Sequence, residues 1–320
     1  MNLLQNKNKH NKKEQNIPLY KVDYAFSYLI LKYEKSQIFV FLSCQYLPNY
    51  FKLQFNDKIL KIFYEDFVTC IKGRNLEKEE DNIFYTGLLN GKLTEWNIEP
   101  CLDSNNKSKS KNKNKFNIRV NEVKHVYAHK SSITAIEIYL RQNIIITSGE
   151  DKFIYIRKIF DFELLTVINL TYSYGNPIIS KTPNVFPSLL KVSKLNLLYV
   201  LLYDKDSKRT FIRGYNLNGL FFAQTDPHYF KNKKQYLQFN NISFTKNSNL
   251  IVGFYNWNKF CVVNASNLKP SWLEKIDDDE KGTKMINYNY IEGEFYIVYK
   301  NKLIIMTIKD KNKLKEFDSF

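Results

Sequence analysis

The chain has 320 residues, of which 44% are hydrophobic and 16% aromatic, so it carries enough apolar side chain to bury a substantial core. Its 24 Phe and 23 Tyr favour strands over helices. The net charge of +16 raises the question of a nucleic-acid partner, but residues 1–16 (net +3) and 102–116 (net +4) together hold 7 of those 16 charges. Since both stretches read as flexible, we do not expect a nucleic-acid surface.

Several classes of protein are excluded at this stage. The four cysteines form no CxxC pair and the four histidines form no ligand cluster, so we expect no metal and no cofactor. The N-terminus lacks the apolar segment of a secretory signal, and the strongest apolar run, Leu197–Tyr203, is too short to cross a bilayer. We therefore expect a cytoplasmic protein that can lie at the periphery of membranes.

Strand-like runs recur along the chain at a spacing of roughly 40 residues, which is typical of propeller blades. Before them, residues 1–16 are expected to form a disordered basic tail. The repeat domain is expected over residues 17–318, with a flexible Lys/Ser/Asn-rich insert at 102–116 between two blades. Six groups of runs follow in chain order: Phe39–Gln54, Phe67–Ile98, Ala128–Leu170, Ser188–Gln224, Asn241–Asn264 and Ile286–Ile308.

The group Ala128–Leu170 is the clearest. It predicts four short strands separated by polar turns, at Ile133–Tyr139, Ile144–Thr147, Phe153–Ile156 and Leu164–Ile168. Four such strands make one propeller blade. The sequence therefore predicts an all-β chain that folds as a WD-type β-propeller of six to seven four-stranded blades, some of them degenerate.

Blades of the WD type often contain a buried polar chain of His, Asp, Ser or Thr, and Trp, in which each group satisfies the next. In the clearest group the matching residues are His129, Thr147 and Asp151, with Arg157 at the Trp position. Arg157 either leaves the chain incomplete or pairs with Asp151 in another way. A catalytic triad is not expected, because Thr147 lies within a strand and not on an exposed turn.

The preceding group repeats the pattern. Thr86, Asn90 and Trp96 match it, and no His is identifiable. Asn90 lies six positions before Trp96, as Asp151 lies six positions before Arg157. Equal offsets in two separate segments support a structural repeat.

Several segments resemble the WD-repeat propeller that follows the BEACH domain in beige and neurobeachin-like proteins. The resemblance covers most of residues 35–310 and implies a propeller that serves as a docking platform in vesicle trafficking and membrane dynamics. Because no BEACH-like helical region precedes these segments, we expect a C-terminal part of such a protein or a separate gene for it. The similar segments are Leu42–Leu53, which lacks the family's Asp, Val68–Ile71, Thr86–Trp96, Ala128–Leu165 and Arg213–Thr225.

These observations predict a non-catalytic scaffold, and not an enzyme, that binds other proteins or peptides on the propeller faces. Ser131, Gly91 and Arg213 are the expected partner-facing residues. A weak association of the lysine-rich insert with anionic membrane surfaces stays open. The alternative is a basic propeller of an RNA-processing or ribosome-assembly particle, which predicts RNA binding that persists when residues 1–16 and 102–116 are deleted.

Overall fold

The fold is taken from a computed structural model. The expected basic tail, residues 1–16, and residues 103–115 of the expected insert lie outside the part of the chain that it describes. The described residues are 25–33, 36–43, 50–55, 58–63, 65–74, 82–102, 116–171, 184–206, 209–225, 239, 242–244, 250–255, 259–275, 287–291, 294–299 and 302–307.

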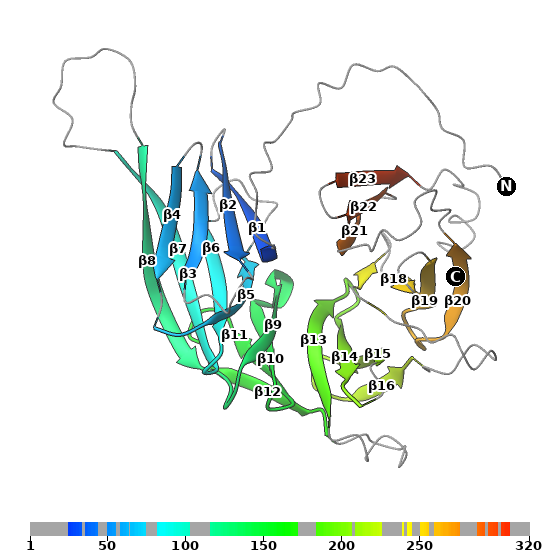
Figure 1. The fold of residues 1–320 in the computed structure, drawn as a ribbon. Coiled ribbons are helices and arrows are strands. Elements are labelled where there is room, and N and C mark those ends of the chain that lie inside the picture. Colours follow the sequence, from blue (N-terminus) through cyan, green and yellow to red (C-terminus); the bar gives the residue numbers. More distant parts are fainter. Residues whose placement is uncertain are drawn as a thin grey trace, which may run out of the picture.

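The described residues form six antiparallel sheets, which we call sheets A to F, and each is a run of strands paired in chain order (Figure 1). Sheet A comprises β1 (Ala25–Tyr33), β2 (Ser36–Ser43), β3 (Tyr50–Phe55) and β4 (Lys58–Phe63). Sheet B comprises β5 (Val68–Gly73), β6 (Ile83–Leu88), β7 (Lys92–Leu102) and β8 (Phe116–Tyr127). Sheet C comprises β9 (Ile133–Tyr139), β10 (Ile144–Gly149), β11 (Phe153–Lys158) and β12 (Leu164–Asn169).

The second half of the chain continues the pattern. Sheet D comprises β13 (Val185–Val192), β14 (Leu197–Asp204), β15 (Arg209–Asn216) and β16 (Phe221–Gln224). Sheet E comprises β17 (Ser243–Phe244), β18 (Leu250–Tyr255), β19 (Lys259–Asn264) and β20 (Pro270–Lys275). Sheet F has three described strands, β21 (Asn287–Ile291), β22 (Glu294–Tyr299) and β23 (Lys302–Thr307). The all-β class expected from the sequence is confirmed.

The first strand of each sheet, which we call its leading strand, contacts the leading strand of the next sheet from sheet A through sheet D. These contacts join β1 to β5, β5 to β9 and β9 to β13, and Figure 1 shows the sheets following one another around an arc. Thr69 Oγ1 donates to the carbonyl of Ile133 at 2.6 Å near the start of β5 and β9, and Lys72 lies against Glu137 near their ends. Strands β5 and β9 therefore run in the same direction.

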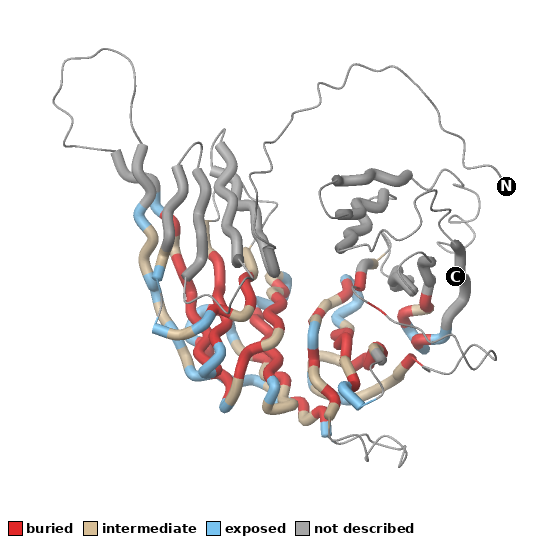
Figure 2. The backbone as a smooth tube through the Cα atoms, in the orientation of Figure 1, coloured by how far each residue is buried: buried red, intermediate tan, exposed pale blue. Residues whose placement is uncertain are grey.

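The core lies between the sheets because successive side chains of a strand point to opposite faces. Strand β10 shows this alternation. Ile144 and Ile146 pack with sheet D, whereas Ile145 packs with Cys70 and Tyr85 of sheet B. Strands β6, β10 and β14 are accordingly buried on both faces, and Figure 2 shows the buried segments in red.

The predicted strands of the clearest group agree with sheet C. Strand β9 has the predicted bounds, and β10, β11 and β12 begin where predicted and end one or two residues later. The predicted place of the insert is wrong: residues 103–115 connect β7 to β8 within sheet B and do not lie between two sheets. Within the described residues the only helix is a single 3₁₀ turn, η1 (Leu140–Gln142), and none could span a membrane.

Candidate functional site

A network of buried polar side chains, which we call the polar link of sheet C, joins the loop before β9 to β10 and to the β10–β11 turn. His129 lies in the loop between β8 and β9, and its Nδ1 is 2.9 and 3.1 Å from the two carboxylate oxygens of Asp151 in the β10–β11 turn. Its Nε2 is 3.0 Å from Thr147 Oγ1 on β10. The carboxylate also accepts hydrogen bonds from the backbone N–H groups of Lys130 (3.1 Å) and Phe153 (3.2 Å). The structure therefore brings together all three residues that the sequence proposed for this chain.

The side chains of the link are largely buried. The side chain of His129 is 0% exposed and that of Asp151 10%, while Thr147 is 0% exposed. Burial raises the pKa of Asp151, but the hydrogen bonds from His129, Lys130 and Phe153 outweigh burial and hold the pKa below its ordinary value. Since an ionised carboxylate only accepts hydrogen bonds, Nδ1 carries a proton. The Thr147 hydroxyl is fully buried and bonded to His129, so the three side chains act as hydrogen-bond partners for one another.

Arg157, which stands at the Trp position of sheet C, takes no part in this link. Its guanidinium donates to the carbonyl of Phe162 at 2.9 Å and lies over the ring of Tyr155, 5.5 Å from the centroid. The Tyr155 ring in turn packs edge-on against His129 at 4.7 Å between centroids. Of the two possibilities that the sequence left open, the incomplete chain is therefore the one present.

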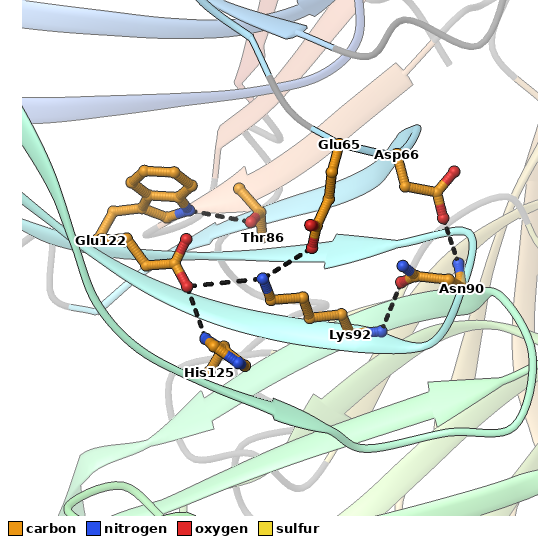
Figure 3. Close-up of polar contacts among 8 residues, drawn as sticks. Glu65, Asp66, Thr86, Asn90, Lys92, Glu122 and His125 are labelled. Atoms are coloured by element: carbon orange, nitrogen blue, oxygen red, sulfur yellow. Dashed lines mark hydrogen bonds and ion pairs between the residues drawn. The ribbon is translucent and has the colours of Figure 1, made fainter.

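Sheet B contains a related link, in which the carboxylate lies in the loop before the first strand and not in the turn. Trp96 Nε1 donates to Thr86 Oγ1 at 3.0 Å, and the Asn90 side chain accepts the backbone N–H of Lys92 at 3.0 Å, as Asp151 accepts that of Phe153 (Figure 3). Asp66, in the loop before β5, accepts the backbone N–H of Asn90 at 2.8 Å. In sheet C the carboxylate belongs to the turn, whereas here it belongs to the entering loop.

Asp66 thus links the entering loop of sheet B to its turn, although it lies two residues before β5, whereas His129 lies four residues before β9. The sequence did not predict this contact, since an Asp at the start of a strand is typical of an ordinary loop. Its carboxylate also accepts the backbone N–H of Phe67 at 2.8 Å, which fixes the first turn into β5. No local signal marks it, because Asp66 accepts the backbone N–H of Asn90, a group that any residue except Pro presents at that position.

A chain of ion pairs continues from this link toward the surface. Lys92 is 6% exposed, and its Nζ lies 2.8 Å from Glu65 and 3.6 Å from Glu122, which approaches His125 Nδ1 at 2.7 Å (Figure 3). Burial lowers the pKa of Lys92, but the hydrogen bond to Glu65 and the charge of Glu122 raise it by more. The pKa therefore lies above its ordinary value, and the ammonium stays protonated. Nowhere in the described residues do three His, Cys, Asp or Glu side chains gather to hold a metal.

The prediction that Arg213 faces a partner is wrong. Arg213 on β15 is 2% exposed, donating to the backbone carbonyl of Leu170 at 2.9 Å and to the Gln224 side chain at 2.8 Å. Its guanidinium also lies over the Phe211 ring. Arg213 joins sheet D to the end of sheet C, and its charge is not available to a partner.

Gly91 is also enclosed, and only Ser131 keeps partial exposure. Gly91 has φ +83°, which favours glycine, and its carbonyl accepts the backbone N–H groups of Ala128 (2.9 Å) and His129 (3.2 Å). A Cβ at Gly91 would collide with the His129 backbone. Gly91 therefore fastens the β6–β7 turn of sheet B to the loop that enters sheet C.

Comparison with known proteins adds evidence on the fold alone. No family model matches the chain, and no curated protein matches it. Among solved structures 1076 chains match, so the architecture is common. One is the crystal structure of the computationally designed Ika8 protein, which is 14% identical over 89% of this chain and 71% of its own, with a TM-score of 0.53. At that identity the likeness extends to the all-β fold and does not select a function.

Proposed function

We propose that the chain is a WD-type β-propeller in which sheets A to F are blades. The leading strands β1, β5, β9 and β13 contact one another in order, and β5 and β9 run in the same direction, as a radial stack of sheets requires. Sheets B and C carry matching polar links, with Thr86 and Asn90 in the places of Thr147 and Asp151. The missing Trp makes the blade of sheet C degenerate, and in sheet B the entering loop contacts the turn through Asp66 and no His.

The function that this architecture supports best is a non-catalytic scaffold for other proteins. The observation that supports it best is that the side chains with catalytic potential are engaged in structural contacts. His129 is buried and forms hydrogen bonds with both Asp151 and Thr147. The outer strands, in contrast, expose apolar side chains, with Tyr127 64% exposed on β8 and Leu165 47% exposed on β12. Exposed apolar side chains on a rigid sheet are suited to partner binding.

The setting of this scaffold is proposed from the sequence resemblance to the propellers of beige and neurobeachin-like proteins. The proposed setting is vesicle trafficking, in the cytoplasm and at the periphery of membranes, with other proteins or peptides as partners. Gly91 and Arg213 form hydrogen bonds inside the molecule and are not available to a partner. The proposed partner-facing surface is therefore on the outer strands and the ends of the leading strands.

Affinity capture of the intact protein, followed by mass spectrometry, tests the proposal. The matched control is a variant with Tyr127→Ser and Leu165→Ser, both on exposed outer-strand positions where folding should be preserved. Proteins of vesicle traffic that are captured by the wild type and lost from the control support the scaffold. Capture of ribonucleoprotein components that survives deletion of residues 1–16 and 102–116 would favour the RNA-particle alternative and overturn it.

A further inference from the structure

The outer strand of sheet C, β12, is packed on one face and exposed on the other. The packed face lies under the β15–β16 turn of sheet D, where Gly219 lies against the side chains of Thr166 and Ile168. Ile168 is also part of the core that sheets C and D share. Three apolar side chains of β12 are exposed instead: Leu164 (44%), Leu165 (47%) and Val167 (45%).

The register of β11 and β12 places these exposed side chains together. Val167 lies opposite Tyr155, and Leu164 lies opposite Arg157. Since Tyr155 and Arg157 are two positions apart on one strand, both pairs have their side chains on the same face of the sheet. Leu165 is the extra residue of the bulge between the two pairs. The exposed side chains of β12 therefore form one continuous apolar strip.

The backbone of β12 also has hydrogen-bonding groups that point outward. The Leu170 N–H donates to the Lys152 carbonyl at 2.9 Å, and hydrogen-bonded pairs alternate with non-bonded pairs along an antiparallel ladder. The N–H and C=O groups of Val167 and Asn169 therefore point away from β11. Among the described strands, none pairs with β12 on that side. A free edge of this kind can pair with one more strand.

The composition of β12 does not oppose such pairing. Strands β4, β8 and β20, which are outer strands of their sheets, each contain at least one lysine, and a charged side chain on an edge opposes the addition of a strand. Strand β12 (LLTVIN) contains no charged residue and no Pro. Strand β16 also lacks charge, but it has only four residues, and none of them is fully exposed. Strand β12 thus combines a free edge, an exposed apolar strip and an uncharged sequence.

A cation beside this strip lacks a carboxylate. Arg157 donates to the Phe162 carbonyl and lies over the Tyr155 ring, its Nε is buried without a hydrogen-bond partner, and no described carboxylate forms an ion pair with it. Glu163, which directly precedes β12, pairs with Lys158. Because β12 itself has no acidic residue, a second copy paired through the same strand would leave both Arg157 side chains without an opposite charge. Charge complementarity therefore favours an acidic partner over a second copy.

We propose that β12 binds an extended segment of a partner protein as one further strand of sheet C, with apolar side chains on the strip and an Asp or Glu side chain paired with Arg157. The inference rests on the proposed scaffold function and identifies the binding surface and the kind of partner. Main-chain hydrogen bonds to Val167 and Asn169 supply affinity in this arrangement. The apolar contacts and the ion pair select the sequence of the segment.

Selection of short random peptides displayed on phage, with the full chain as bait, tests the chemistry of the partner. The selected peptides should alternate β-branched or aromatic residues with other residues and carry an acidic residue. In fluorescence anisotropy with such a peptide, Val167→Lys should raise the Kd about tenfold, because a lysine on the edge opposes strand addition. The matched control is Val123→Lys on β8, where the Val is 52% exposed, and it should leave the Kd unchanged. Selected peptides whose affinity is the same for wild type and Val167→Lys would overturn the inference.

A double-mutant cycle separates the ion pair from a structural effect of Arg157. Arg157→Gln should raise the Kd about fivefold, and so should Gln in place of the acidic residue of the peptide. The two changes together should weaken binding no more than either alone, since they remove the same contact. Losses that multiply would contradict the proposed pairing, whatever Arg157→Gln does to the melting temperature.

Two further results would assign the strip differently. Sedimentation that shows wild-type dimers, which Val167→Lys dissociates, would identify a second copy as the occupant and overturn the inference. If captured partners are lost with Tyr127→Ser and Leu165→Ser but persist in Val167→Lys, the inference fails and the scaffold function stands.

Discussion

Replacing Asp151 with Ala should destabilise the protein by about 3 kcal/mol. The change removes the only acceptor of His129 Nδ1, whose side chain is 0% exposed, and an unpaired buried donor costs about 1–3 kcal/mol. The backbone N–H groups of Lys130 and Phe153 also lose their partner, at about 0.5–1 kcal/mol each, because water reaches them in part. Asp151→Asn should cost less, about 1–2 kcal/mol, since Asn90 shows that an amide can serve the same turn.

The pH dependence of the free energy of unfolding tests the contribution of Asp151 a second time. The folded pKa of Asp151 lies below its ordinary value of 3.8, so its contribution to stability is present above about pH 4. That contribution is lost as the pH falls below 4 and through the folded pKa. Asp151→Asn should remove this part of the acid dependence while leaving the rest.

Urea unfolding followed by tryptophan fluorescence at pH 7, 5 and 3 measures both effects. The wild type and Asp151→Asn should differ at pH 7, and the difference should narrow as the pH falls below 4. If Asp151→Ala unfolds at the wild-type urea concentration at pH 7, then the buried link does not stabilise sheet C. The reasoning from its hydrogen bonds would then be refuted.

Three other substitutions test the contacts between and within sheets. Trp96→Phe should cost about 1–2 kcal/mol in urea unfolding, because the Thr hydroxyl that it bonds is fully buried, and an unchanged midpoint would contradict this. Gly91→Ala should cost about 2–3 kcal/mol, since φ is +83° and the new methyl collides with the next loop; thermal unfolding that matches the wild type would exclude that strain. Arg213→Met should cost about 2–3 kcal/mol by leaving the Leu170 carbonyl unpaired, with a loss of hydrogen-exchange protection at the end of sheet C as its signature.

The sequence predicted the strands best where apolar residues alternate and turns are short. Ile133–Tyr139 satisfies both conditions, and its bounds were correct. The insert was misplaced because Phe116–Tyr127, the strand that follows it, pairs with β7 across a long connection, and pairing over that separation leaves no local pattern. A run of polar residues marks a loop but does not say which two strands it joins.

The candidate site divides in the same way. His129, Thr147 and Asp151 lie within 23 residues of one another and follow a repeated spacing, so the sequence could group them. Arg213 could not be placed, because its burial depends on the Leu170 carbonyl, 43 residues away in another sheet. Charged residues are ordinarily expected at the surface, and only a partner from a distant segment reverses that expectation.

The Gly91 carbonyl, which accepts the amide hydrogens of Ala128 and His129, has a consequence for how the protein unfolds. The acceptor belongs to sheet B, and the donors belong to the loop that opens sheet C. Unfolding either sheet alone would break these hydrogen bonds and leave their donors and acceptor without partners. Sheets B and C should therefore lose amide protection together, as one cooperative unit, in native-state hydrogen exchange. A fragment cut between the two sheets should accordingly be less protected than the same residues in the intact chain, even if every contact within the fragment were kept.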